Sequence, residues 1–320
     1  MMDLSILIST FNGEKDIRLL LDSIAEIEKN AYFLEVILRD DCSSDDTSKI
    51  VKEEYKWVKV LEDNYGNIGF VKSNNLLFQE AEGKVICCVN QDTILHPRFV
   101  VEGMRMINQN PEVAGVNTNM IMPWIMPLDK YRNAESTQLP AYEYQLTSYG
   151  YVRYIEVERQ SREANFMTGG GFFVRSAVFP SNYLFDPDID MYCEDTELSL
   201  RLQRHGWKML YCPEAVIYHN QIRKKATVFR DLIKLIRITK NRFALFARIE
   251  SPSSYSRRYI KYVLGIINKM KYIGLSFPKN VGAYIAGIVI AVLFLFFFPY
   301  WLNYSKKSKK NSILSLIQKV

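Results

Sequence analysis

The chain has 320 residues, and its 41 lysines and arginines exceed its 35 aspartates and glutamates by six. Its five cysteines are odd in number and none forms a C-x-x-C pair, which excludes a disulfide framework and a metal site built on such pairs, and fits a reducing compartment. No internal repeat or low-complexity tract is present. The first residues lack a basic segment, so we expect no signal peptide.

Apolar runs and helix-like patterns alternate along the first ninety residues. The runs at residues 33–38 and 84–89 are short and largely apolar, which is typical of strands buried on both faces of a parallel sheet. After an opening strand near residues 5–8, apolar side chains recur at helical spacing, at Ile17, Leu20, Leu21, Ile24 and Ile27. The alternation of the two patterns predicts an α/β layered domain.

Acidic side chains follow two of these predicted strands directly. Asp40 and Asp41 come after the run at 33–38, and Asp92 comes three residues after the run at 84–89. In open α/β sheets, ligands bind beyond the carboxyl ends of the strands, so we expect the two clusters to converge on one site. For the nearby Asp45 and Asp46, a structural role as turn and N-cap residues fits the sequence as well as a role in the site.

The most informative stretch runs from residue 193 to residue 219. Glu194 and Asp195 lie in the first turn of a predicted helix, where the helix dipole favours negative charge, so the pair alone indicates only an acidic cap. A break at Gly206 and Trp207, a short apolar strand and a lone histidine, His219, follow.

In this order the motifs resemble those of family 2 inverting glycosyltransferases of the GT-A fold, from about residue 3 to residue 220. Asn90-Gln91-Asp92 occupies the D-x-D place, with asparagine instead of the first aspartate, as in rhamnosyltransferase-like members. The other matching segments are the opening strand and turn (5–12), the D-x-x-S-x-D-x-T turn (40–47), the run at 67–70, the glycines at 169–171, the acidic pair and the late histidine.

The resemblance implies a role for each residue type. Asp92 and His219 would hold a divalent cation, Mn²⁺ or Mg²⁺, that neutralises the leaving diphosphate. Asp195 would be the general base that takes the proton of the acceptor hydroxyl. Glu194 and Trp207 would contact the acceptor. The implied nucleotide- or donor-binding residues, with Asp40 accepting from the base and the glycines letting backbone approach the sugar, are Thr10, Asn12, Asp40, Asn67, Gly170 and Gly171.

Several of these residues also have a structural reading, which the sequence leaves open. Asp92 could cap the segment before Pro97, and Glu194 could simply cap its helix. A lone histidine such as His219 is more often structural than a ligand. Trp207 fits a core position better than a cleft. Residues 117–165, rich in Met, Pro and Tyr, predict a loop-rich insertion that would shape the acceptor cleft.

Charge divides the chain in two. Residues 221–320 hold 20 lysines and arginines against Asp231 and Glu250, a net charge of +18, which leaves 21 basic and 33 acidic residues and −12 for residues 1–220. Such asymmetry indicates an anionic partner, either nucleic acid or an anionic membrane surface.

Apolar patterning favours the membrane. Residues 280–305 contain no charged residue, and residues 281–302 are nearly all apolar, which is long enough to cross a bilayer of about 30 Å. Tyr300 and Trp301 lie at one end, as in an interfacial belt. Apolar faces interleaved with lysine and arginine upstream are typical of helices in the headgroup region. Ordinary helices packed on the first domain are the alternative, and a re-entrant segment bent near Pro299 is compatible with the charges.

The sequence therefore predicts four parts: a GT-A glycosyltransferase domain with a mostly parallel sheet (1–220), basic amphipathic helices on the membrane surface (221–279), a transmembrane or re-entrant segment (280–303) and a basic tail (304–320). Its expected activity is metal-dependent transfer, with inversion, of a sugar such as rhamnose from a UDP- or dTDP-sugar to a glycan or lipid-linked acceptor in cell-surface polysaccharide synthesis.

The expected location is the cell membrane, with the catalytic domain on the cytoplasmic face, and the expected partners are the nucleotide-diphosphate sugar, the acceptor and anionic lipids, but no nucleic acid. Two alternatives remain from the sequence: a sugar-activating nucleotidyltransferase, and a non-catalytic membrane scaffold of the same fold. A nucleotidyltransferase would more often have a glycine-rich, basic loop directly after its first strand. Residues 10–14, which follow the first predicted strand here, do not form such a loop. Loss of Asp92 or Asp195 would have favoured the scaffold, and both are present.

Overall fold

The structure is a computed structural model that describes residues 2–28, 32–147, 152–179, 183–189, 191–220, 237, 238, 240–242, 244 and 245. The chain divides into two compact units, and the first, which includes Met1–Leu146 and Val152–Ile222, holds every element named below. The second includes Arg223–Ile313, whose few described residues are helical. The predicted segments 221–279, 280–303 and 304–320 thus lie outside the described residues, apart from those few.

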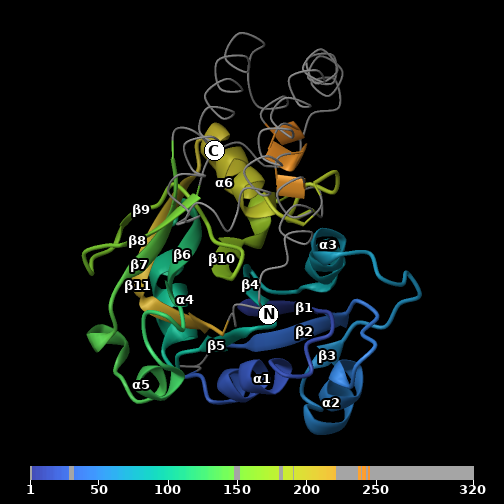
Figure 1. Cartoon of the computed structure of the whole chain (residues 1–320). Coiled ribbons are helices and arrows are strands. Elements are labelled where there is room, and N and C mark those ends of the chain that lie inside the picture. Colours follow the sequence, from blue (N-terminus) through green and yellow to red (C-terminus); the bar gives the residue numbers. More distant parts are fainter. Residues whose placement is uncertain are drawn as a thin grey trace, which may run out of the picture. The chain divides into compact units, whose positions relative to one another are not determined.

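The first unit is built on one twisted sheet (Figure 1). Its strands are β1 (Leu4–Thr10), β2 (Leu34–Asp40), β3 (Lys59–Val60), β4 (Val85–Asn90), β5 (Thr93–Leu95), β6 (Val113–Ile121), β9 (Arg162–Glu163), β10 (Gly171–Arg175) and β11 (Lys208–His219). Along the sheet they follow the order β3-β2-β1-β4-β10-β6-β11-β5, and β9 pairs with β11. The strand β1 is parallel to both β2 and β4, and β6 is parallel to β11.

The sheet is mixed, which corrects the expectation of a mostly parallel one. The strand β10 is antiparallel to both of its neighbours, β4 and β6, and β11 is antiparallel to β5 and β9. The sequence pattern misses this because a short apolar run looks the same in either direction. The strand β10 pairs with residues of β4 and β6 that are 55 to 90 positions away in the sequence.

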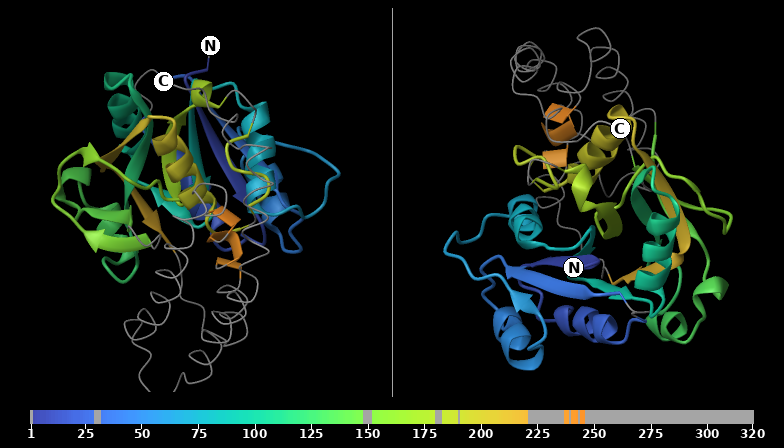
Figure 2. Two further views of the ribbon diagram at one scale, coloured as in Figure 1. Left: turned by 90° about the horizontal axis from the view of Figure 1, so that it is seen from above. Right: turned by 180° about the vertical axis from the view of Figure 1, so that it is seen from behind.

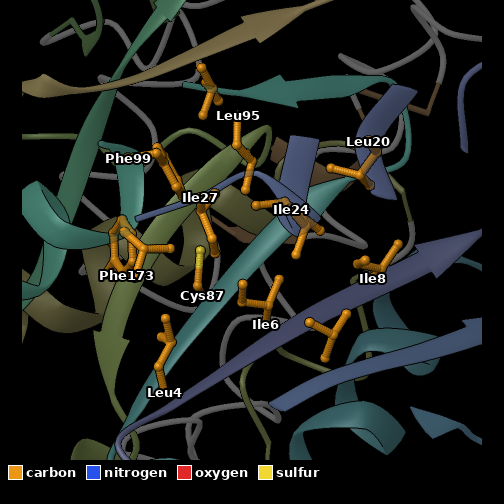
Figure 3. Packing of buried hydrophobic residues seen from close by; sticks show 14 of the residues in the cluster. Leu4, Ile6, Ile8, Leu20, Ile24, Ile27, Cys87, Leu95, Phe99 and Phe173 are labelled. Carbon is orange, nitrogen blue, oxygen red and sulfur yellow. The ribbon is translucent and has the colours of Figure 1, made fainter. Parts of the chain in front are cut away.

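Helices cover both faces of the sheet. They are α1 (Ile17–Ala25), α2 (Thr47–Glu54), α3 (Phe70–Glu80), α4 (Phe99–Gln109), α5 (Leu128–Arg132) and α6 (Glu194–Arg204), with short 3-10 turns at Ser136–Gln138 and Ser176–Val178. The alternation of β1 decides which helix packs where: Ile6 and Ile8 pack with α1, α2 and α4, whereas Leu7 packs with α3 and α6. Figure 3 shows the first of these cores, in which Ile6, Leu20 and Phe99 are fully buried.

A hairpin lies beside the main sheet. Its strands β7 (Tyr142–Leu146) and β8 (Val152–Glu156) are antiparallel and lie at the edge of the first unit (Figure 2). The strand β7 contacts β6, and the Tyr211 hydroxyl of β11 donates to the Tyr142 carbonyl. The region 117–165, expected to be rich in loops, therefore also contains the end of β6, α5, this hairpin and β9. Within the part of the chain that the structure describes, no helix is both long and apolar enough to cross a membrane.

Candidate active site

The ends of β1, β2 and β4 meet at one edge of the sheet, as the parallel register requires. Thr10 is paired with Asp40 across β1 and β2, and Ser9 with Asn90 across β1 and β4. The two polar clusters predicted after β2 and β4 are therefore neighbours of the same β1 terminus. The sequence argument about strand ends holds for Asp40 and for the 90–92 segment alike.

The turn after β1 is held by side chains from the turn after β2. Asn12, whose φ of 50° is in the left-handed region, accepts the Ser44 N–H at 2.8 Å, and its own N–H donates to Ser43 Oγ at 2.8 Å. The Asp40 carboxylate in turn accepts the Ser43 N–H at 3.1 Å and the Ser43 hydroxyl. Asn12 and Asp40 thus belong to one rigid turn pair, with Ser43 as the link between them.

Further residues of the D-x-x-S-x-D-x-T turn have structural roles. The Gly13 N–H donates to Thr47 Oγ1 at 2.8 Å, and the Glu14 N–H donates to Asp45 Oδ2 at 3.2 Å. Burial opposes ionisation of Asp45, but hydrogen bonds from the Thr47 hydroxyl, the Thr47 N–H and the Glu14 N–H lower its pKa. For Asp45 the turn reading, which the sequence left open, is the one its contacts support.

Thr10 is linked to the D-x-D segment by a residue the sequence reasoning missed. Gln91 Oε1 accepts from the Thr10 hydroxyl at 2.7 Å and from the Phe11 N–H at 2.8 Å, while Gln91 Nε2 donates to the Phe11 carbonyl at 3.2 Å. Thr10 is buried, and its hydroxyl is used in this hydrogen bond to Gln91. The middle position of a three-residue motif carries no signal of its own, because only the tertiary contact gives it a partner.

Asn67 lies in the exposed loop before α3. Two glycines with positive φ, Gly66 and Gly69, frame it, and Asp41 accepts the N–H groups of Ile68 and Gly69 at 2.8 Å each. Asp41 is itself paired with buried Arg39 at 2.5 Å. The second aspartate of the Asp40-Asp41 cluster therefore fixes the loop that carries Asn67.

Asp92 and His219 are in direct contact. His219 Nε2 lies 3.0 Å from Asp92 Oδ1, and the pairing of β11 with β5 brings His219 opposite Thr93. His219 Nδ1 is buried with no hydrogen-bond partner within the described residues, and so is Asn90 Oδ1. Among the described residues no group of three or more His, Cys, Asp or Glu side chains could hold a metal.

Two protein ligands are nevertheless sufficient for some cations. Mg²⁺ is often bound by one or two carboxylates together with the phosphates of its substrate, and Mn²⁺ also accepts imidazole nitrogen. Asp92 and His219 fit such a site, in which the substrate completes the metal's ligands. Within the described residues, His219 Nδ1 and the nearby Asn90 Oδ1 have no hydrogen-bond partner.

The acidic pair begins α6 after a strained turn. Tyr192 and Cys193 have φ values of 77° and 76°, a region that non-glycine residues rarely adopt and that is frequent at functional sites. Asp195 Oδ1 accepts the Thr196 N–H at 2.7 Å. Glu194 Oε2 is buried and has no hydrogen-bond partner within the described part of the chain. Burial, and then the charge of Asp195, raise the pKa of Glu194 to about 8.

The glycines at 169–171 bring the two halves of the site together. A Cβ placed on Gly169 would lie 3.7 Å from Glu194 Oε1 and 3.8 Å from Asp195 Oδ2. One placed on Gly170 would lie 3.8 Å from His219 Nδ1, and would collide with Met120 Cε at 2.2 Å. The acidic pair therefore lies close to Gly169, and His219 of the Asp92–His219 pair lies close to the adjacent Gly170.

Trp207 is the candidate that the structure does not bring to this group. It follows the C-terminal end of α6, an 11-residue helix that spans about 16 Å at 1.5 Å per residue, whereas Glu194 begins that helix. Its ring packs against the core shared by α3 and α6. The core reading of Trp207 is the one supported by its contacts.

Comparison with known proteins identifies the family. The family model described as glycosyltransferase like family 2 matches residues 3–236 of the chain. The chain belongs to this family. The expected resemblance to family 2 glycosyltransferases is thereby confirmed.

The relatives of this family 2 chain point the same way. The poly(ribitol-phosphate) beta-N-acetylglucosaminyltransferase TarS of Staphylococcus aureus (strain Mu50) is 33% identical over 115 residues, which make up 34% of this chain and 20% of TarS. The matched part is thus a small share of that longer protein.

Solved structures share the fold. A crystal structure of S. aureus TarS 1–349 in complex with UDP is 16% identical with a TM-score of 0.52, and the match covers 87% of this chain and 74% of that one. A crystal structure of GalNAc-T7 with UDP, GalNAc and Mn²⁺ is 14% identical with a TM-score of 0.55, covering 88% and 58%. At these identities the likeness concerns the fold, which is a GT-A-like α/β fold with a mixed sheet.

Proposed function

We propose that the protein is a metal-dependent inverting glycosyltransferase that moves a sugar from a UDP donor to a hydroxyl of a glycan or lipid-linked acceptor. The observation that carries the proposal is the pair of adjacent glycines: Gly169 is close to Glu194 and Asp195, and Gly170 is close to His219, which contacts Asp92. A reacting sugar beside this segment would have a base and a cation-binding pair within reach.

The cation would be held by Asp92 and His219 together with the diphosphate of the donor. When bound, it neutralises the negative charge that grows on the leaving diphosphate. The two residues would supply one carboxylate and one imidazole as ligands, and their partly buried contact with each other would orient both side chains.

Asp195 is the proposed general base. The acceptor O–H gives its proton to the Asp195 carboxylate, its oxygen forms the new bond to the anomeric carbon, and the bond from that carbon to the diphosphate oxygen breaks with its electron pair leaving on UDP. Attack from the face opposite the diphosphate inverts the anomeric centre. Glu194, with its raised pKa, would be the protonated neighbour that leaves Asp195 as the charged member of the pair.

The nucleotide would lie at the ends of β1 and β2. Asp40 is the proposed acceptor for the imide N–H of the base, in a turn stiffened by Asn12 and Ser43. Thr10 contributes by fixing the β1 terminus through Gln91. Asn67 and Gly171 complete the proposed donor side. Uridine is favoured over thymidine because structures of the same fold contain UDP.

For the sugar, two suggestions compete. The Asn90 pattern led us to expect a deoxyhexose such as rhamnose, whereas TarS is named for N-acetylglucosamine. We propose an N-acetylhexosamine first, since a structure of TarS 1–349 of the same fold, with a TM-score of 0.53, contains UDP-GlcNAc.

The test is a donor panel. Purified protein is incubated with UDP-GlcNAc, UDP-GalNAc, UDP-glucose and dTDP-rhamnose, and release of the free nucleotide is followed with Mn²⁺, with Mg²⁺ and with excess EDTA. We expect hydrolysis of one UDP-sugar that needs the metal and is lost in Asp92→Ala. Full hydrolysis in EDTA would reject metal dependence, and no hydrolysis of any donor would favour the non-catalytic scaffold.

The location is part of the proposal. We propose that the C-terminal part holds the enzyme at the cytoplasmic face of the cell membrane, near anionic lipids and a lipid-linked acceptor. The support is the +18 charge of residues 221–320 and the uncharged run within residues 280–305.

A further inference from the structure

The β7–β8 hairpin carries a cluster of tyrosines. Tyr144 is paired directly with Tyr154, with ring centroids 4.8 Å apart, and Tyr142 is stacked on Tyr154 at 5.0 Å. The hydroxyls of two of them are used inside the protein, since Tyr142 donates to Glu156 at 3.2 Å and Tyr154 donates to the Met120 carbonyl at 2.6 Å. Tyr144 is half-buried, and none of the hydrogen bonds within the described residues uses its hydroxyl.

A chain of contacts connects Tyr144 with the glycine segment at 169–170. Tyr144 packs on Tyr154, Tyr154 is bonded to Met120, and the Met120 side chain lies where a Cβ of Gly170 would be. The neighbouring Gly169 is close to the acidic pair that begins α6. Tyr144 is therefore two contacts away from Met120, the residue whose side chain approaches Gly170.

The hairpin is fixed to the elements that carry the site. Asn165 accepts the Leu146 N–H and donates to the Leu146 carbonyl, both at 2.9 Å. The Asn165 carbonyl also accepts from Gln203 of α6 at 2.9 Å. On the other face of β7, buried Glu143 is bonded to Arg162 at 3.1 Å. The β7 backbone is thus attached, two residues after Tyr144, to Asn165 and through it to Gln203 near the C-terminal end of α6.

The electrostatics of Tyr144 agree with this placement. Burial, and then the charge of Asp195, raise the pKa of Tyr144 to about 12. The Tyr144 hydroxyl is therefore protonated at physiological pH and can donate a hydrogen bond. Its interaction with the charge of Asp195, the proposed base, is one cause of the raised pKa.

We propose that Tyr144 forms the acceptor subsite: its ring packs against the apolar face of a sugar or polyol, and its hydroxyl donates a hydrogen bond to an acceptor oxygen, which holds the reacting hydroxyl against Asp195. This inference rests on the proposed transferase function. An aromatic ring supplies a large, rigid contact area with a polar tip, and orientation of two reactants is a large part of catalysis. A subsite built on this attached hairpin supplies both.

Two substitutions separate the ring from the hydroxyl. Tyr144→Phe keeps the ring, so we expect the acceptor KM to rise about 2–10-fold, the usual weight of one hydrogen bond. Tyr144→Ala also removes the ring, and we expect a rise of about 10–100-fold, comparable to stacking of a ring on an aromatic side chain. Donor hydrolysis without acceptor should stay at the wild-type rate in both. Tyr142→Phe is the matched control, because its hydroxyl is bonded to Glu156 and should leave acceptor KM unchanged.

The probes are methyl glycosides and free polyols, including ribitol, with UDP-GlcNAc as donor. Binding of the same probes is measured independently of turnover by saturation-transfer NMR on the full chain, and thermal melts confirm that each variant folds. Loss of probe binding in Tyr144→Ala with retained donor hydrolysis supports the subsite. Equal binding or equal acceptor KM in wild type and Tyr144→Ala overturns it, and so does a loss of donor hydrolysis in a folded Tyr144→Phe. Absence of all hydrolysis in the wild type rejects the transferase function instead, while the NMR comparison still decides the subsite.

Discussion

Glu194 combines a buried carboxyl oxygen, no hydrogen-bond partner for that oxygen among the described residues, and a charged neighbour. Its pKa of about 8 in the folded protein lies above the ordinary value of 4.5, so between these pH values the folded state binds more protons than the unfolded chain. The contribution of Glu194 to stability is therefore complete below about pH 4.5 and is lost as the pH rises through 8.

We predict that Glu194→Gln removes this pH dependence. The free energy of unfolding of the variant, relative to wild type, should increase from pH 5 to pH 9, as measured by denaturant melts at four pH values. Glu54→Gln is the control: the hydrogen bond with Arg18 lowers the pKa of Glu54, so the difference between this variant and wild type should stay constant from pH 5 to pH 9 and should shrink only at more acid pH. A difference between Glu194→Gln and wild type that stays constant from pH 5 to pH 9 would contradict a raised pKa.

Asp195 is the residue on which the proposed chemistry depends. Asp195→Asn keeps the Oδ1 atom that accepts the Thr196 N–H, so the start of α6 should be preserved. We predict that transfer falls about 10²–10⁴-fold, the usual weight of general-base catalysis, while the donor Kd stays within about twofold. The two quantities come from steady-state transfer assays and calorimetric titration with UDP-sugar. A collapse of donor affinity with a near-normal rate would make Asp195 a donor-site residue.

At the scale of the element, α6 is positioned by a buried ion pair. Arg201 donates to Glu197 through Nε at 2.7 Å and through Nη2 at 3.0 Å, and Nη2 also donates to the Leu184 carbonyl at 2.7 Å. Both side chains are almost fully buried. The segment around Leu184 is held a second time by Asn75 of α3, which exchanges two hydrogen bonds with Phe185. The helix that carries the acidic pair is thus tied to the segment preceding it.

We predict that Glu197→Ala destabilises the fold by about 3–5 kcal/mol, because it leaves the Arg201 charge buried without its partner. The exposed pair of Arg18 and Glu54 provides the comparison, and Glu54→Ala should unfold close to the wild-type midpoint. Chemical denaturation of the three proteins measures the difference. If both substitutions have the same small effect, the pair around α6 does not stabilise the element.

At the scale of the whole molecule, the contrast in charge between the two parts of the chain leads to a membrane prediction. The full chain should sediment with membranes and resist extraction by high salt and by alkaline carbonate, because a buried apolar span attaches nearly permanently. A chain ending at Lys279 should be released by high salt, since surface lysines bind anionic lipids by screened electrostatics. Release of the full chain by carbonate would show that residues 280–303 are not an integral segment.

The sequence by itself determined the layered α/β class and the strand ends at which Asp40 and Asp92 lie. It did so because burial imposes a local period on apolar residues, and because a polar group that follows a buried strand has to emerge at the edge of the sheet. The position of Glu194 and Asp195 at the start of a helix was equally local, since dipole and capping preferences act within one turn.

Only the tertiary structure decided the antiparallel place of β10, the bond from Thr10 to Gln91, the packing of Trp207 against the core shared by α3 and α6, and the effect of the Asp195 charge on the pKa of Tyr144. Each depends on register and packing between segments tens of residues apart, which no local pattern encodes. Gln91 and Tyr144 have ordinary sequence surroundings, and they become candidates for function only because the fold brings partners to them.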